Sequence, residues 1–168
     1  MNLQAVALGA AGMEADHRVR EEGGNNRGPR VRTYLLGIDP PISTAAPWCA
    51  AFVQYCSDVA ARTLGVPNPL DAVRLEAYVQ SYADELQHQT VGMGSALPGD
   101  LVLYSFGGER WDHIGFFSHR GDGDVFWVVE GNTSLSNPRD GGGVALKARD
   151  MSAGDRDPIF IRWGSPPE

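Results

Sequence analysis

With 168 residues, the chain has the length of one average domain, and we expect a single domain over residues 1–168. Hydrophobic residues make up 42% and charged residues 21%, which argues against a disordered tail, a collagen-like protein or a coiled coil. The 14 basic and 21 acidic residues give a net charge of −7, so phosphate backbones and anionic membrane surfaces would repel the chain. We therefore expect no nucleic acid and no membrane as partner, and no stretch approaches the roughly 20 apolar residues that span a bilayer.

The start of the sequence predicts helices separated by a proline-rich loop. Residues 1–12 are apolar without a basic segment before them, so we expect a helix or loop of the domain there rather than a secretion signal. Residues 29–36 have apolar side chains at helical spacing and stop before a glycine, which predicts a short helix. Residues 38–46 contain two prolines and should be irregular.

A central helix is predicted over residues 47–64. Pro47 suits a first helical turn, where its missing N–H would have no acceptor in any case, and the alanine-rich segment after it stops at Gly65. Asp71 has the side chain of an N-cap, and we expect a further helix from there to about Gln87.

The second half changes to short β-rich segments bounded by Gly, Pro, Asp or Asn. We expect strands over residues 101–106, 114–118, 125–130, 144–147 and 159–163. Helices followed by consecutive strands predict an α+β fold with an antiparallel sheet of about five or six strands.

Cys49 falls in the first turn of the predicted central helix. Amide groups without acceptors and the positive end of the helix dipole favour a thiolate there, which is the nucleophilic form of cysteine; the alternative is a small buried hydrophobic residue. Cys56 falls in the middle of the same helix, as a core or surface thiol. The two positions would lie about 10.5 Å apart along the helix axis, too far for a disulfide, so we expect free thiols.

A base for this nucleophile is predicted on a β-hairpin. Two β-rich segments are joined by a short Gly/Asp turn, and a turn centred between residues 121 and 122 would place His113 opposite Glu130. The Cβ atoms of such a pair lie about 4.5 to 5.5 Å apart, so the carboxylate could orient the imidazole. Asn132 would lie on the same face, within diagonal reach.

This pairing has two further consequences. His119 would face Asp124 beside the turn as a solvated pair. A shift of the register by one residue would put His113 and Glu130 on opposite faces, and an exposed strand-edge pair is the alternative to a catalytic one.

A zinc site must be weighed, because the chain has two cysteines and four histidines. The spacing of these residues argues against it. His113 and His119 would lie about 20 Å apart along a strand, and the cysteines about 10 Å apart along a helix, so neither pair could bind one ion at about 2.0 to 2.3 Å. A serine hydrolase lacks its Gly-x-Ser-x-Gly segment. We expect no metal and no cofactor.

Five short segments spread over roughly residues 20 to 135 read, in chain order, Gly24-Asn25-Asn26-Arg27-Gly28-Pro29, Ala46-Pro47-Trp48-Cys49-Ala50-Ala51-Phe52-Val53, Pro98-Gly99-Asp100-Leu101-Val102, Asp112-His113-Ile114-Gly115-Phe116 and Glu130-Gly131-Asn132-Thr133-Ser134. In this order they resemble the CHAP family, the cysteine, histidine-dependent amidohydrolases/peptidases, which belong with the NlpC/P60-like and papain-like cysteine hydrolases. Any one segment is weak evidence for this resemblance, but the five segments in the same order are strong evidence.

The resemblance implies a papain-like (NlpC/P60-like) fold, in which the helix that carries the nucleophile packs on an antiparallel sheet. Cys49 matches the nucleophile and His113 the general base. Glu130 matches the residue that orients the histidine, and Asn132 a further polar residue of the family's site.

Three more residues are candidates for contact with substrate. Asn26 and Arg27 could line the cleft, with a plain turn before the next helix as the alternative. Trp48 precedes the nucleophile, with simple packing at the helix start as the alternative.

Members of the family typically cut amide bonds of peptidoglycan. The resemblance therefore implies an N-acetylmuramoyl-L-alanine amidase or a stem or cross-bridge endopeptidase that works through an acyl-enzyme. A cysteine peptidase or acyl-transfer enzyme on a substrate outside the cell wall, and a binding module without activity, are the alternatives. Some members have a calcium loop before the cysteine, but residues 38–46 offer only Asp39, so we expect none here.

The expected partner is peptidoglycan or its peptide stems, and we expect a monomer. The chain has no recognisable cell-wall-binding repeat and no evident signal peptide. It would then be made in the cytoplasm and reach the cell wall or periplasm as a phage endolysin or as a bacteriolytic toxin of a secretion system. A delivery protein or an immunity protein could then be a partner.

Overall fold

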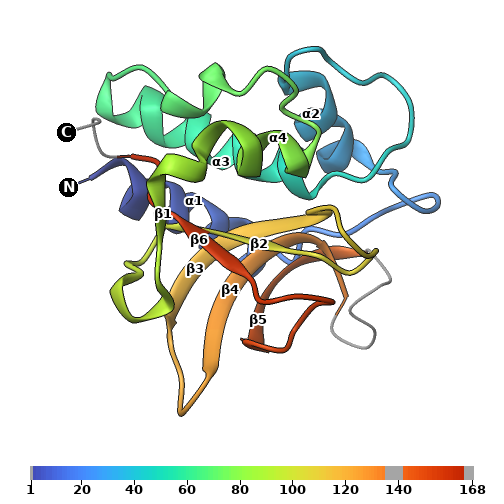
Figure 1. Ribbon diagram of the computed structural model, residues 1–168. Coiled ribbons are helices and arrows are strands. Elements are labelled where there is room, and N and C mark those ends of the chain that lie inside the picture. Colours follow the sequence, from blue (N-terminus) through green and yellow to red (C-terminus); the bar gives the residue numbers. More distant parts are fainter. Residues whose placement is uncertain (1, 135–141, 165–168) are drawn as a thin grey trace.

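The structure, a computed structural model, describes residues 2–134 and 142–164. Within them it is an α+β fold in which the helices come first and an antiparallel sheet follows (Figure 1). The described α-helices are α1 (Leu3–Asp16), α2 (Pro29–Gly37), α3 (Cys49–Leu64) and α4 (Val79–Leu86), with 3₁₀ turns at Pro69–Ala72, Gln87–Gln89 and Met93–Ser95. The described strands are β1 (Thr90–Val91), β2 (Leu101–Tyr104), β3 (His113–Arg120), β4 (Val125–Thr133), β5 (Gly143–Asp150) and β6 (Ile159–Ile161).

All six of these strands form one sheet in the order β1-β6-β2-β3-β4-β5, and every neighbouring pair is antiparallel. The predicted α+β class with an antiparallel sheet is therefore confirmed. The sequence missed β1, which is two residues long and pairs with β6. A strand this short has too few residues to show an alternating pattern.

The helices α1 and α3 pack directly on the sheet, and Figure 1 shows α2 and α4 beside α3. Ala7 and Ala11 of α1 are fully buried, and their small side chains let α1 approach α3 closely. On the sheet side of α3, the ring of Phe52 meets Phe116 of β3 edge to face, with centroids 6.4 Å apart. These contacts fix the start of α3 relative to the central strands.

The helix α3 begins at Cys49, two residues later than predicted, and ends at the predicted position. Gly65 closes it in a left-handed conformation with φ 66°, and its backbone N–H donates to the carbonyl of Ala61. Trp48 occupies the N-cap position but gives no side-chain hydrogen bond to the helix. Cys49 is consequently the first helical residue.

The helix predicted over residues 71–87 is wrong in its first half, because α4 begins only at Val79. A 3₁₀ turn lies before it and is capped by Asn68, whose side chain accepts a backbone N–H at 3.1 Å. The Asp71 carboxylate instead accepts a hydrogen bond from Gln54 Nε2 of α3 at 2.8 Å. A tertiary contact thus occupies the side chain that locally resembled an N-cap.

The predicted register of the β3–β4 hairpin is wrong by three residues beside the turn and by two at Glu130. Its turn spans residues 121–124 and is longer than the predicted tight turn, and β3 has a bulge between Phe117 and His119. Gly115, and not His113, therefore lies opposite Glu130. Because the error at Glu130 is an even number of residues, His113 and Glu130 still point to the same face of the sheet.

The predicted pair of His119 and Asp124 is also wrong. His119 lies opposite Trp127 in the ladder, and the two rings stack with centroids 5.7 Å apart and an interplanar angle of 13°. The turn explains the change, since beside it Arg120 already lies opposite Phe126, a shift of three residues from the predicted pairing. The bulge adds one residue to β3 and reduces this shift to two at Gly115.

The sheet is buried on both faces. The face toward the helices carries Leu101, Leu103, Ile114, Phe116 and Val129. The opposite face has a second apolar cluster formed by Val102, Tyr104, Phe117, Phe126, Val128 and Phe160. His113 lies beside this second cluster, with its ring centroid 5.9 Å from that of Tyr104.

Gly131 allows β4 to approach α3 closely. A Cβ atom at this position would lie 2.6 Å from Cγ of Phe52, which is far inside van der Waals contact. We expect Gly131→Ala to lower the free energy of unfolding by about 1 to 3 kcal/mol, as measured by urea titration. Gly9→Ala in α1, where an added Cβ meets nothing within 4 Å, is the matched control and should not destabilise.

A second substitution separates this clash from other effects. Phe52→Leu removes ring atoms from the contact, so it should cost less stability in the Gly131→Ala background than in the wild-type chain. Wild-type stability of Gly131→Ala would contradict the close approach.

Candidate active site

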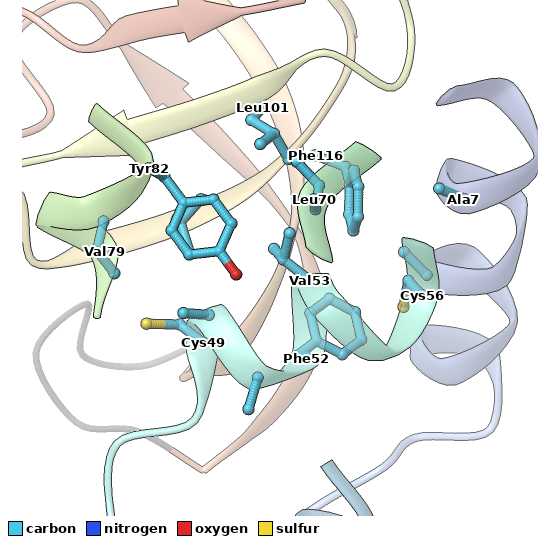
Figure 2. Packing of buried hydrophobic residues seen from close by; sticks show 14 of the residues in the cluster. Ala7, Cys49, Phe52, Val53, Cys56, Leu70, Val79, Tyr82, Leu101 and Phe116 are labelled. Atoms are coloured by element: carbon cyan, nitrogen blue, oxygen red, sulfur yellow. The ribbon is translucent and has the colours of Figure 1, made fainter. Parts of the chain in front are cut away.

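Cys49 and Cys56 belong to the same helix, α3, but have different surroundings. Figure 2 shows Cys49 at the start of α3 beside Val79 and Tyr82, whereas Cys56 lies further along the helix, toward Ala7 of α1. Both are free thiols, as predicted, and both are buried. Burial raises the pKa of Cys56 well above its usual value, and the nearby charge of Glu14 raises it further, so its thiol stays protonated.

The Cys49 thiol instead meets polar groups. Its Sγ lies 3.9 Å from the backbone carbonyl oxygen of Asp112. The next residue is His113, the first residue of β3, and its imidazole lies close enough to the Cys49 side chain to interact with it. The start of α3 and the start of β3 thus bring a thiol and an imidazole together from positions 64 residues apart in the sequence.

Of the four histidines, His113 alone is buried, while His17, His88 and His119 are exposed. Its Nε2 atom lies 3.0 Å from Oε2 of Glu130, whose side chain has no exposed surface. The predicted meeting of these two side chains is therefore present, although they are not opposite each other in the ladder.

Gly115 explains how Glu130 reaches His113 diagonally. Gly115 is the residue opposite Glu130, and a Cβ there would lie 2.9 Å from Cγ of Glu130. The missing side chain leaves room for Glu130 to extend along β3 toward His113, two residues away. His113 and Glu130 lie on the same face of the sheet, as predicted, and the glycine supplies the space for their contact.

The pairing decides the protonation of both groups. Burial alone would lower the pKa of His113, but the charge of Glu130 and hydrogen bonds with Cys49 and Glu130 raise it to about 10. Burial alone would raise the pKa of Glu130, but the charges and hydrogen bonds of His113 and Arg149 lower it to about 2. At neutral pH the site therefore holds an imidazolium beside the thiol, and an imidazolium favours the thiolate.

Arg149 of β5 is the site residue that sequence reasoning missed. Its Nε donates to Oε1 of Glu130 at 2.9 Å, and its Nη2 donates to Oε2 at 2.7 Å. The fourth predicted β-rich segment signalled this region, but the predicted strand ended at residue 147, while β5 continues to Asp150. Buried and exposed positions do not alternate regularly along β5, so a two-residue period gave no signal for Arg149.

Asn132 lies at a second irregularity, in β4. Its φ of 54° is left-handed, and the β4–β5 ladder shifts register between Glu130 and Thr133. Its Oδ1 atom is buried and accepts no hydrogen bond from the residues that the structure describes. Asn132 is thus near the pair in sequence, but it is not hydrogen bonded to His113.

The chain matches no family model, and it matches no curated protein. The resemblance to the CHAP family therefore rests on the motif residues quoted above. Among residues 2–134 and 142–164, no three His, Cys, Asp or Glu side chains gather where they could hold a metal ion. No helix in these two segments has the length and apolar character needed to cross a membrane.

Trp48 is held by two groups and has no exposed surface. Its indole Nε1 donates to Oε1 of Glu21 at 2.9 Å, and its ring stacks on Tyr34 with centroids 5.5 Å apart. These contacts support the backbone immediately before Cys49. A fully buried ring contributes packing there and offers no surface to a substrate.

Asn26 and Arg27 lie in a turn before α2 and border an open pocket of about 550 Å³. The backbone N–H of Glu22 donates to the carbonyl of Arg27 at 2.8 Å, and Asn26 has a left-handed φ of 56°. The other side of the pocket is formed by residues 42–45, which lead toward Cys49. The pocket lining includes neither Cys49 nor His113.

The buried Glu130 carboxylate should make the protein less stable in acid. Its folded pKa of about 2 lies below the usual 4.5, so its contribution to stability is complete above pH 4.5 and is lost as the pH falls toward 2. This group alone should lower the free energy of unfolding by at most about 1.4 kcal/mol per pH unit in that window. Urea titrations across the window would measure the slope.

The variant Glu130→Gln isolates this contribution. It leaves Arg149 buried without its counter-charge, so the variant should be less stable at neutral pH by about 3 to 5 kcal/mol, and its acid slope should be shallower than that of the wild type. Asp124→Asn removes an exposed carboxylate from the β3–β4 turn and should keep the wild-type slope. Parallel pH curves for the wild type and Glu130→Gln would contradict the assigned ionisation.

Proposed function

We propose that the chain is a cysteine amidohydrolase of the CHAP type, with a papain-like fold, that cleaves amide bonds of peptidoglycan. The observation that carries this proposal is the buried chain of contacts from Cys49 at the start of α3 through His113 to Glu130. A nucleophile, a base and a group that orients the base are the parts that acyl transfer needs. The peptidoglycan substrate comes from the family resemblance.

In the proposed reaction, the Cys49 thiolate attacks the amide carbonyl carbon. The C–N bond then breaks, a thioester forms, and His113 gives its proton to the leaving amine. In the second half, His113 takes a proton from water, which attacks the thioester and releases the acid and the Cys49 thiolate. Since Nε2 is held by Glu130, Nδ1 is the nitrogen that we assign to this proton transfer.

The negative charge on the carbonyl oxygen needs donors near the nucleophile. The first intrahelical hydrogen bond of α3 joins the N–H of Phe52 to the carbonyl of Trp48 at 2.9 Å. The amides before Phe52 therefore have no acceptor within the helix, and they lie at the positive end of its dipole. We assign the oxyanion to these amides of the first turn.

Digestion of purified sacculi tests the proposal. The wild-type chain should release fragments with new amino groups, and mass spectrometry of the fragments would identify the bond: a free N-terminal alanine indicates an amidase, and a free amine within the stem or cross-bridge an endopeptidase. Intact sacculi after incubation with folded wild-type protein would contradict the proposal. Transfer of the acyl group to an added amine without hydrolysis would favour the acyl-transfer alternative.

A further inference from the structure

Arg149 and Glu130 form the most buried ion pair in the described part of the chain. Both oxygens of the Glu130 carboxylate accept from the guanidinium, at 2.9 Å and 2.7 Å, and Oε2 also contacts His113 Nε2 at 3.0 Å. The side chains of Glu130 and Arg149 are 0% and 7% exposed. One carboxylate oxygen is thus shared between an arginine and a histidine away from solvent.

Two aromatic rings hold the arginine and the histidine in the same place. The guanidinium carbon of Arg149 lies 5.4 Å from the ring centroids of both Tyr104 and Phe106. The ring of His113 lies 5.9 Å from each of the same two centroids. Neither cation can move far without losing contact with these rings, so the rings help to fix the geometry of the carboxylate between them.

During the reaction, the Glu130 carboxylate needs a second cation besides His113. When His113 gives its proton to the leaving amine, a Glu130 carboxylate without Arg149 would be a buried charge with no cation beside it. That cost would hold the proton on His113 and slow its transfer. With Arg149 present, the carboxylate keeps a counter-charge in both protonation states of His113.

We propose that Arg149 is a positioning residue for the reaction proposed above: its guanidinium fixes the Glu130 carboxylate in the orientation that reaches His113, and its charge lets His113 release as well as hold a proton. This inference rests on the proposed function for its catalytic consequence. Its electrostatic part, which concerns the Cys49–His113 pair, can be measured without any substrate.

The charged and titratable groups around His113 come from several elements: Cys49 of α3, Tyr104 of β2, Asp112 before β3, Glu130 of β4, and Lys147 and Arg149 of β5. Other groups bind two of these side chains. Asp112 Oδ1 accepts the backbone N–H of Phe106 at 2.9 Å, and the Lys147 ammonium donates to the carbonyl of Ser134. Arg149 is therefore the cation whose removal acts most directly on Glu130.

The first experiment measures alkylation of Cys49 by iodoacetamide against pH, with Cys49→Ser as the background. In Arg149→Met, Glu130 acts on His113 without an opposing charge, so the imidazolium should persist to higher pH than in the wild type. The limb of the alkylation profile at which His113 loses its proton should therefore move to higher pH. An unmoved limb, or a limb moved to lower pH, would overturn the proposal.

Arg149→Lys separates charge from geometry. The lysine keeps the positive charge but loses the bidentate hydrogen bonding to Glu130. The pH dependence of alkylation in this variant should therefore stay near that of the wild type. Its kcat on a soluble muropeptide should nevertheless fall by about 10- to 100-fold with little change in KM, because the carboxylate is no longer fixed. Wild-type kcat in Arg149→Lys would overturn the positioning role, and this variant decides the matter if Arg149→Met does not fold.

Arg30→Met is the matched control. Arg30 also binds a glutamate through two nitrogens, in this case Glu14 of α1, but it lies outside the site. Its loss should lower stability and leave the alkylation profile unchanged.

If the wild type cuts no muropeptide while the alkylation results hold, the proposed function fails and the role of Arg149 in the pair stands. If hydrolysis is found but Arg149→Met matches the wild type in both assays, the proposed function stands and this inference fails.

Discussion

Replacing Cys49 by serine is expected to abolish amide hydrolysis, with a loss of at least about 1,000-fold in kcat. The substitution changes the volume little, so the fold should remain, but a serine hydroxyl beside His113 is not ionised as a thiol can be. Release of new amino groups from a soluble muropeptide, followed by mass spectrometry, measures the loss. Sacculus turbidity is less suitable because it combines binding with chemistry.

Cys56→Ala is the control for this experiment. Cys56 is fully buried in the contact between α3 and α1, so its truncation should cost some stability without changing the site. We expect near wild-type kcat below the unfolding temperature of the variant. Loss of activity in Cys56→Ala together with an active Cys49→Ser would show that the nucleophile is assigned to the wrong cysteine.

The helical part of the site was accessible from the sequence because its signals are local. A proline and a run of alanines predict the central helix, and Gly65 predicts its end, so the place of Cys49 in the first turn follows from neighbouring residues. The failure over residues 71–78 has the opposite cause. There, the Asp71 carboxylate binds Gln54 of another helix, and such a tertiary contact leaves no trace in the local sequence.

The hairpin shows which part of a register can be predicted. Alternation of side chains sets the face on which a residue lies, and it placed His113 and Glu130 together correctly. The exact pairing depends on the length of the turn and on the bulge before His119, neither of which alternation reveals. Arg149 was harder still, because its contact with Glu130 requires β5 to pair with β4 over its whole length.

Replacing His113 by alanine should remove hydrolysis as completely as replacing Cys49. Without the imidazole, no histidine among the described residues is left beside Cys49 to take its proton or to protonate the leaving amine. The fold should survive, because Glu130 keeps its two hydrogen bonds to Arg149 and so remains paired. The measurement is kcat on the soluble muropeptide. His119→Ala, on the exposed end of the same strand, is the control and should stay active.

The double variant Cys49→Ser, His113→Ala tests whether the two residues act as one unit. If the thiolate exists only through the imidazolium, removing either residue removes the same reaction path, and the double variant should be no more than a few-fold slower than either single one. Independent contributions would instead multiply, and the double variant would lose the product of the two single losses. A multiplicative loss would mean that the nucleophile and base lie in separate steps, and an active His113→Ala would remove His113 from the mechanism altogether.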